Sequence, residues 1–293
     1  MEKKILIPTN FTKHAWNNLV YALNLYKDIP CIFYILNVYD SPTRISLGKN
    51  NNSELETAKN ESEEGLLKIR QGLNFRQENK KHQFETISSD KSLAEAMQDC
   101  IDMYNINLVL MVSKGENISL NAAINNEISD VTEKVENCPF LVLPEIMQEL
   151  PKSNREIVFP TTFKFPFKDK EMVALIDMSK FLNASIRILY IDSDNRPLSK
   201  EQELNKETLK TYFTKVDFSF HKLTQTTLTM GVHLFIESRD SNFLALYKRK
   251  QGFFRKLFSQ RIKEDIDFNP KVPVLILKEL EKVKRSKKIS LGL

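Results

Sequence analysis

The chain has 293 residues, of which 41% are hydrophobic and 28% are charged. This length suits about two domains, and the composition excludes disordered, collagen-like and fibrous classes. No apolar run approaches the roughly 20 residues that span a bilayer, and the first residues do not form a signal peptide. We therefore expect no membrane span and a cytoplasmic location.

The net charge of +5 is divided unequally along the chain. Residues 1–150 carry 15 Lys/Arg against 21 Asp/Glu, which gives −6, and residues 151–293 carry 28 against 17, which gives +11. Such a difference predicts that the two halves have different surroundings or partners.

Cysteines and histidines do not form a recognisable site. The three cysteines, Cys31, Cys100 and Cys138, lie far apart and lack a Cys-x-x-Cys spacing, which predicts packing residues. The four histidines show no metal-ligand spacing, so no zinc site is expected.

The first half alternates apolar strands with amphipathic helices. Thr12 is expected to cap a helix that carries Trp16, Leu19 and Leu23 at helical spacing. Strands are predicted at 4–9, 31–38, 84–88, 107–112 and in "PFLVLP", and further helices at 54–73, 93–104 and 122–136.

The second half repeats the first. "LIPTNF" at residues 6–11 returns as "VFPTTF" at 158–163, an offset of 152 residues. The match continues without a gap to Asp40-Ser41 and Asp192-Ser193, which indicates internal duplication. Strands are predicted at 156–161, 185–191, 218–223, 242–247 and 272–277, with helices between them.

This order predicts an α/β protein with two tandem domains, each a five-stranded parallel sheet flanked by helices. The predicted boundaries are 1–146 for the first domain, 147–280 for the second and 281–293 for a basic C-terminal tail.

The segments "ILIPTNF", "YILNVYD", "LVLMVSKG" and "VTEKVENCPFLVLPE", with "PKVPVLILKE" in the second half, resemble the universal stress protein family. The resemblance implies a Rossmann-like, adenine-nucleotide-alpha-hydrolase-like fold that is often dimeric through its last strand. We therefore expect the halves to pair through "PFLVLP" and "PVLIL" as an intramolecular pseudo-dimer, because pairing removes an exposed apolar edge. Assembly into a larger homo-oligomer stays open.

The better-known branch of that family binds ATP or AMP at the carboxyl ends of its first and fourth strands, where open α/β sheets hold ligands. The family's adenine-binding Asp corresponds to Asn10 and, in the second half, to Thr162. The candidate cleft of the first half consists of Thr9, Asn10, Val38, Met111, Ser113, Gly115 and Asn126.

The glycines of the family's phosphate loop are mostly missing. Val112 stands at the first glycine, Gly115 keeps the second, and Asn126-Glu127 replaces the Gly-Ser that opens the next helix. Backbone amides approach phosphate closely only where no Cβ obstructs them. The second half keeps only Gly252, so both sites are predicted to be degenerate for ATP. No cofactor is expected, and ATP or AMP stays open as the alternative.

A basic stretch at residues 248–263 interleaves lysines and arginines with phenylalanines. Basic and aromatic residues together favour anionic ligands, nucleic acid or a membrane surface. The resemblance makes the phenylalanines packing residues, so nucleic acid is not the expected partner. The candidate anion-binding residues are Arg249, Lys250, Arg255 and Arg261.

No motif of a catalytic nucleophile or metal pair is present. The sequence thus predicts a non-catalytic stress-response or signalling module with an unknown protein partner. Two alternatives stay open. The first is an adenine-nucleotide sensor with slow ATP hydrolysis in the Asn10, Val38 and Gly115 cleft, and the second is an anion- or nucleic-acid-binding adaptor that uses the basic second half.

Overall fold

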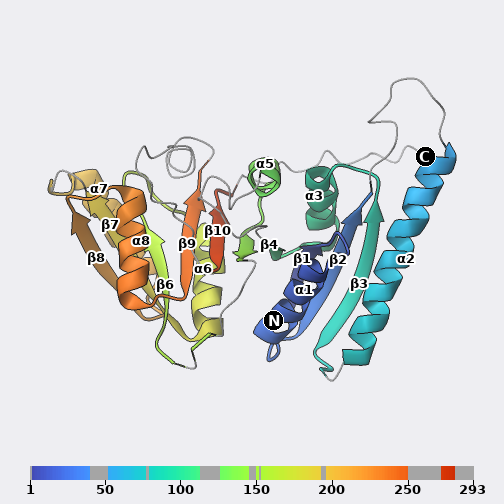
Figure 1. Ribbon diagram of the computed structural model, residues 1–293. Helices are drawn as coiled ribbons and strands as arrows, with labels where there is room; N and C mark the ends of the chain where they lie inside the picture. The colour runs from blue at the N-terminus through green and yellow to red at the C-terminus, as the bar shows by residue number, and fades with distance from the viewer. Residues whose placement is uncertain are drawn as a thin grey trace, which may run out of the picture.

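One ten-stranded sheet runs through the computed structural model (Figure 1). The structure describes residues 2–39, 52–76, 79–112, 126–144, 150–151, 153–192, 196–249 and 272–280. The strand order is β3-β2-β1-β4-β5-β10-β9-β6-β7-β8, so the first half of the chain forms one side of the sheet and the second half forms the other.

The first half contains the five parallel strands that the sequence predicts. The middle of β1 and most of β2 and β4 are buried, as expected for strands covered by helices on both faces. The elements are β1 Lys3–Pro8, α1 Lys13–Leu25, β2 Cys31–Val38, α2 Asn52–Arg76, β3 His82–Ser89, α3 Leu93–Tyr104, β4 Leu108–Val112, α5 Asn126–Lys134 and β5 Phe140–Leu143.

The second half repeats this order, and its described strands are also parallel to one another. The helix predicted between its last two strands, like residues 122–125 of the first half, lies outside the described residues. The elements are β6 Arg155–Pro160, α6 Asp169–Leu182, β7 Ala184–Asp192, α7 Lys200–Tyr212, β8 Phe218–Thr224, α8 Leu228–Arg239, β9 Phe243–Lys248 and β10 Val274–Lys278.

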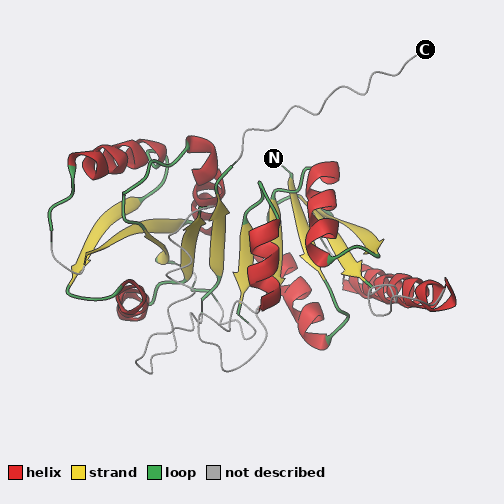
Figure 2. Cartoon of the chain, turned by 90° about the horizontal axis from the view of Figure 1, so that it is seen from above, coloured by secondary structure: helices red, strands yellow, loops and turns green. Residues whose placement is uncertain are grey.

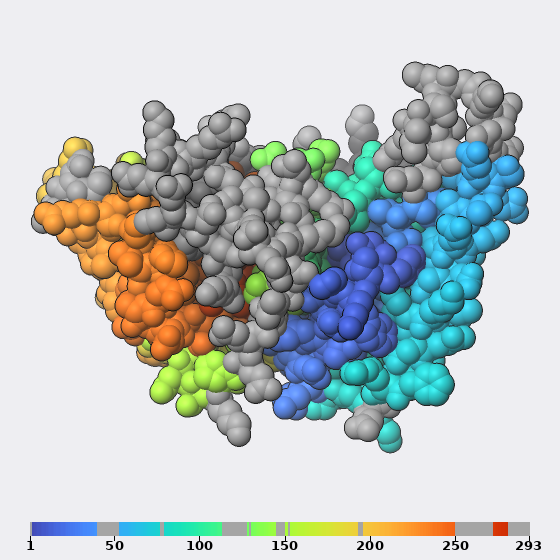
Figure 3. All heavy atoms as spheres, in the orientation of Figure 1, coloured from blue at the N-terminus to red at the C-terminus, as the bar shows by residue number. Residues whose placement is uncertain are grey.

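Helices cover both faces of the sheet (Figure 2). Figure 3 shows one of these faces, with the side chains of α1 and α2 toward one end of the molecule and those of α8 toward the other. No helix in the described ranges is long and apolar enough to cross a membrane.

The two halves are joined by their fifth strands, which confirms the predicted pairing. β10 pairs with β5 in antiparallel register, with Leu275 opposite Leu141 and Ile276 opposite Phe140. These side chains are at most 2% exposed. Pairing therefore hides two apolar edges inside one continuous sheet.

Lys278 ties the second half to a helix of the first. Its ammonium group donates hydrogen bonds to the carbonyl oxygens of Thr132 and Val135, the latter at 2.7 Å, and lies 5.0 Å from the centre of the Phe140 ring. Thr132 lies in the last turn of α5 and Val135 directly follows the helix, where carbonyl groups lack helical partners and a cation is favoured. Strand β10 thus supplies the C-terminal cap of a helix in the other half.

The repeated Pro-Thr corner has a local physical cause. Phe11 and its counterpart Phe163 both adopt left-handed backbone angles, with φ of 62° and 54°. In each corner the threonine hydroxyl, of Thr9 or Thr161, accepts a hydrogen bond of 3.2 Å from the N–H of that phenylalanine. A bulky residue is uncommon in this region, and the threonine hydroxyl stabilises the turn. The duplicated motif therefore specifies a strained turn at the end of the first strand of each half.

The start of the first helix differs between the halves. Thr12 caps α1 as predicted, because its hydroxyl accepts a hydrogen bond of 3.3 Å from the N–H of Ala15. At the offset of 152 residues α6 would begin at Phe165, but it begins four residues later at Asp169. Pro166 explains the delay, because a proline disfavours helical angles in the residue before it. Residues 164–168 therefore form a loop that the first half lacks.

Candidate functional site

In each half, the order in which successive strands are added to the sheet reverses at one point. In the first half it lies between β1 and β4, and in the second between β6 and β9. Ligands of open α/β sheets bind beside the carboxyl ends of the strands at such points. The candidate site therefore consists of two clefts, one per half.

The first cleft brings together four of the predicted residues. Thr9 and Asn10 directly follow β1, Val38 ends β2, and Met111 lies near the end of β4. Strand β1 pairs with both β2 and β4, so these residues lie at one edge of the sheet. Met111 is buried, Thr9 and Val38 are half-buried, and Asn10 is exposed.

The side chain of Asn10 forms hydrogen bonds within the turn that follows β1. Its Oδ1 accepts hydrogen bonds from the hydroxyl of Thr12 at 2.7 Å and from the N–H of Thr12 at 3.3 Å. Thr162, its counterpart, accepts a bond of 3.4 Å from the N–H of Lys164 in the same way. The side-chain acceptor at the position of the family's adenine-binding Asp thus stabilises a turn in both halves.

The remaining predicted residues of this cleft are not fully placed. Ser113 and Gly115 lie outside the described residues, and Asn126 begins helix α5, where only its backbone is described.

An aromatic cluster fills the second cleft. The Arg249 guanidinium lies 4.8 Å from the ring centre of Phe165, 5.2 Å from that of Tyr247 and 5.7 Å from that of Phe167. It also donates a hydrogen bond to the carbonyl oxygen of Pro166. Phe165, Pro166 and Phe167 belong to the loop created by the late start of α6. We call these five residues the Arg249 cluster.

Neighbouring contacts hold the cluster in place. The hydroxyl of Tyr247 donates a 2.6 Å hydrogen bond to the buried carboxylate of Glu171, and that of Tyr212 donates a 3.0 Å bond to the carbonyl of Phe167. The space left at this corner is about 30 Å³. Ligand pockets measure about 300–1,000 Å³, so among the described residues the space beside the Arg249 cluster is too small for a ligand.

The Arg249 cluster was not predicted from the sequence, although "TTFKFPFKD" contains a signal. Three phenylalanines at every second position follow the corner, and Pro166 among them keeps the segment out of a helix. Of the candidate anion-binding residues, Arg249 contacts the rings just described, and Lys250, Arg255 and Arg261 lie outside the described residues.

The cysteines and the possible metal ligands of the described ranges form no further site. Cys31, Cys100 and Cys138 are buried, as predicted, and burial raises the pKa values of their thiols to between about 11 and 12. No group of three or more His, Cys, Asp or Glu side chains within these ranges is arranged to hold a metal ion.

The geometry of the chain matches that of known two-domain structures. A universal stress protein from Archaeoglobus fulgidus superposes with a TM-score of 0.65 at 15% identity, over 95% of this chain and 97% of that one. A putative universal stress protein from Pseudomonas aeruginosa superposes with a TM-score of 0.57 at 13% identity, over 94% and 93% of the two chains. No family model and no curated protein matches the sequence.

These full-length superpositions establish the class of fold. The chain has the tandem, Rossmann-like fold of universal stress proteins, with two five-stranded halves joined edge to edge.

Proposed function

We propose that this chain is a universal-stress-type protein that acts as a non-catalytic stress-response or signalling module and does not bind ATP in its second cleft. The Arg249 cluster carries the proposal, because it occupies the position at the strand-order reversal where a nucleotide would lie.

Opening the second cleft would be costly. Each contact of a guanidinium with an aromatic face contributes about 0.5–2 kcal/mol, depending on solvation. Arg249 makes three such contacts; Phe167 is 8% exposed, whereas Phe165 is 53% exposed, so the Phe165 contact belongs to the lower end of that range. A nucleotide would have to displace these contacts without the glycine-rich loop that normally receives its phosphates.

The altered first cleft supports the same function. The Oδ1 atom of Asn10 accepts its hydrogen bonds from Thr12, and Val112, the last residue of β4, stands where the family pattern has a glycine. A module of this kind would present its surface to a protein partner instead of turning over a substrate.

Isothermal titration of the full chain with ATP and Mg²⁺, and separately with AMP, tests the proposal. We expect no binding tighter than about 100 μM, which corresponds to about −5.5 kcal/mol. Replacing Arg249 and Phe165 by alanine should not create such binding, because the phosphate-binding glycines stay absent. Micromolar binding by the parent chain would overturn the proposal.

An adenine-nucleotide sensor is the second candidate function. This function is favoured because Thr9, Val38 and Met111 lie together at the carboxyl ends of their strands, where the strand order reverses. If the parent binds nucleotide, Asn10→Ala and Gly115→Val should weaken binding, whereas the matched Thr162→Ala in the second half should leave it unchanged. That pattern would assign the nucleotide to the first cleft.

A further inference from the structure

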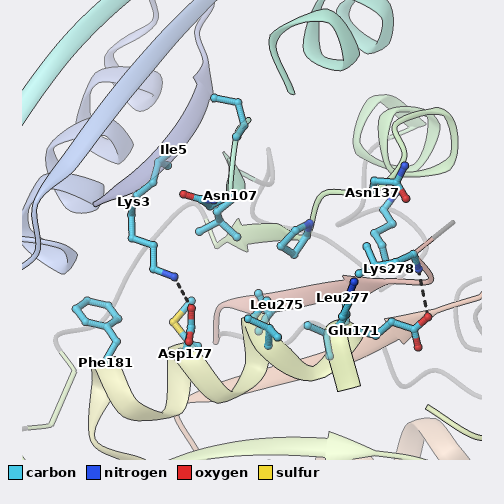
Figure 4. A pocket seen from close by; sticks show the side chains of 18 of the residues that line it. Lys3, Ile5, Asn107, Asn137, Glu171, Asp177, Phe181, Leu275, Leu277 and Lys278 are labelled. Atoms are coloured by element: carbon cyan, nitrogen blue, oxygen red, sulfur yellow. Dashed lines mark hydrogen bonds and ion pairs between the residues drawn. The ribbon is translucent and has the colours of Figure 1, made fainter. Parts of the chain in front are cut away.

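A cavity lies between the two halves. Its volume is about 340 Å³, and its walls come from β1, the beginning of β4 and the end of α1 in the first half and from α6 and β10 in the second. Figure 4 shows Leu275 and Leu277 of β10 beside α6, with Asn107 and Asn137 on the side of the first half. The volume lies within the range of about 300–1,000 Å³ that small-molecule sites occupy.

The walls are mainly aliphatic. The aromatic pair at one end, Tyr26 and Phe181, is already stacked, with ring centres 4.8 Å apart and planes at 6°. A bound molecule would therefore meet branched and straight aliphatic side chains along most of its length. The aliphatic walls include Ile5, Leu108, Val173, Met178, Leu275 and Leu277.

Four of the five charged side chains around the cavity already have partners. Lys3 pairs with Asp177 across the junction (Figure 4). Glu171 accepts hydrogen bonds from Tyr247 at 2.6 Å and from the N–H of Leu280 at 3.2 Å. Lys278 donates to the carbonyls of Thr132 and Val135 at the C-terminal end of α5.

Lys170 is the remaining charge. It lies on the first turn of α6, at the rim of the cavity, and pairs with no described residue. The ammonium of Lys170 is therefore the charge at this rim that no described side chain neutralises.

We propose that this cavity binds an aliphatic carboxylate, with the hydrocarbon chain between β10 and α6 and the carboxylate at Lys170. Burial of a hydrocarbon chain against the aliphatic walls would provide most of the affinity. The unpaired ammonium of Lys170 would select an anionic head group over a neutral or cationic one. Because both halves line the cavity, the ligand would also brace their junction.

Calorimetric titration of the full chain with decanoate, below its micelle concentration, tests this site. We expect one molecule to bind per chain and decyltrimethylammonium, a cation of the same chain length, to bind at least about fivefold more weakly. Val173→Trp should reduce decanoate affinity by at least about tenfold by filling the cavity. Lys170→Gln should reduce it by about two- to fivefold, the effect of one exposed ion pair.

Matched variants control for changes in surface or stability. Val173 is 47% exposed, so circular dichroism should show that its replacement folds, and Leu234→Trp makes the same change at a 52% exposed site on α8. Lys180→Gln removes an exposed lysine from the other end of α6. Neither control should alter decanoate affinity.

Three results would each overturn the inference. The first is no saturable decanoate binding by the parent chain, and the second is equal affinity in the parent and Val173→Trp. The third is equal affinity for decanoate and decyltrimethylammonium. Because these titrations contain no nucleotide, their outcome is independent of the function proposed for the two clefts.

Discussion

A buried ion cluster at the base of the second half provides the sharpest stability prediction. Glu156, near the start of β6, accepts hydrogen bonds from Arg187 at 2.8 Å and from Arg239 at 2.6 and 2.8 Å. Ser241 donates a further bond of 3.3 Å. Its counterpart in the first half is Lys4, so this arrangement is specific to the second copy. We consider the substitution Glu156→Gln, which keeps the shape and removes the charge.

The stability lost in Glu156→Gln depends on how far the three charged side chains are buried. Glu156 is 11% exposed, Arg187 is 18% exposed and Arg239 is 36% exposed. Breaking a fully buried pair costs about 3–5 kcal/mol, because it leaves an uncompensated charge. Solvent screens the part contributed by Arg239, since exposed pairs contribute only about 0–1 kcal/mol. We therefore expect Glu156→Gln to lower the free energy of unfolding by about 2–4 kcal/mol near neutral pH.

The effect should depend on pH in a defined direction. Burial raises the pKa of Glu156, but hydrogen bonds from Arg239 and Arg187 outweigh it and hold the pKa below its usual value of 4.5. A carboxyl group with a lowered folded-state pKa stabilises the fold above its unfolded pKa, and this contribution disappears as the pH falls through the folded pKa. The difference between parent and variant should therefore be full above about pH 5 and shrink below about pH 4.5.

Urea unfolding measures both quantities with two probes. Far-UV circular dichroism reports on the whole chain, and the fluorescence of Trp16, the single tryptophan, reports on the first half. Because the halves share one sheet, we expect both transitions to shift together in the variant. Glu237→Gln, which changes an exposed carboxylate on α8, is the matched control and should have little effect.

A loss below about 0.5 kcal/mol at neutral pH would refute the argument, because that is the range of ordinary surface substitutions. An unchanged Trp16 transition, with a shifted dichroism signal, would instead show that the halves unfold separately.

Two further predictions concern the junction of the halves. Burial, followed by the charge of Lys248, lowers the pKa of Lys278 to about 7, so between about pH 7 and pH 10 the unfolded chain binds more protons than the folded one. The free energy of unfolding should therefore rise with pH over that range in the parent and rise less in Lys278→Met. Urea unfolding at several pH values measures this dependence. Equal slopes of unfolding free energy against pH in the two proteins would contradict the prediction. The amides of residues 141–143 and 275–277 should exchange slowly with solvent because they lie in paired, buried strands, and fast exchange there would argue against the pairing of β5 with β10.

The architecture of this protein was largely determined by local sequence patterns. Apolar runs ending in Pro-Thr, helical spacing after Thr12, and the offset of 152 residues are properties of neighbouring positions, so they predict elements and their order. The pairing of the fifth strands was also predictable, because apolar edge strands must be covered.

The sequence also indicated what the first cleft lacks, since a missing glycine is visible without a structure. It could not show how the remaining residues are used. Asn10 appeared able to contact a base, but the corner directs its acceptor toward Thr12. That direction depends on the left-handed angle at Phe11, which residue identity alone does not reveal.

Only the tertiary structure decided the state of the second cleft and the presence of the cavity between the halves. Arg249 and Phe165 are 84 residues apart in the sequence, and they meet because β6 and β9 are adjacent and α6 starts late. The cavity likewise exists only where α6 and β10 meet β1 and β4. Such sites depend on how distant elements pack and on which way their side chains point. The periodicity of apolar residues along the chain gives no information on either.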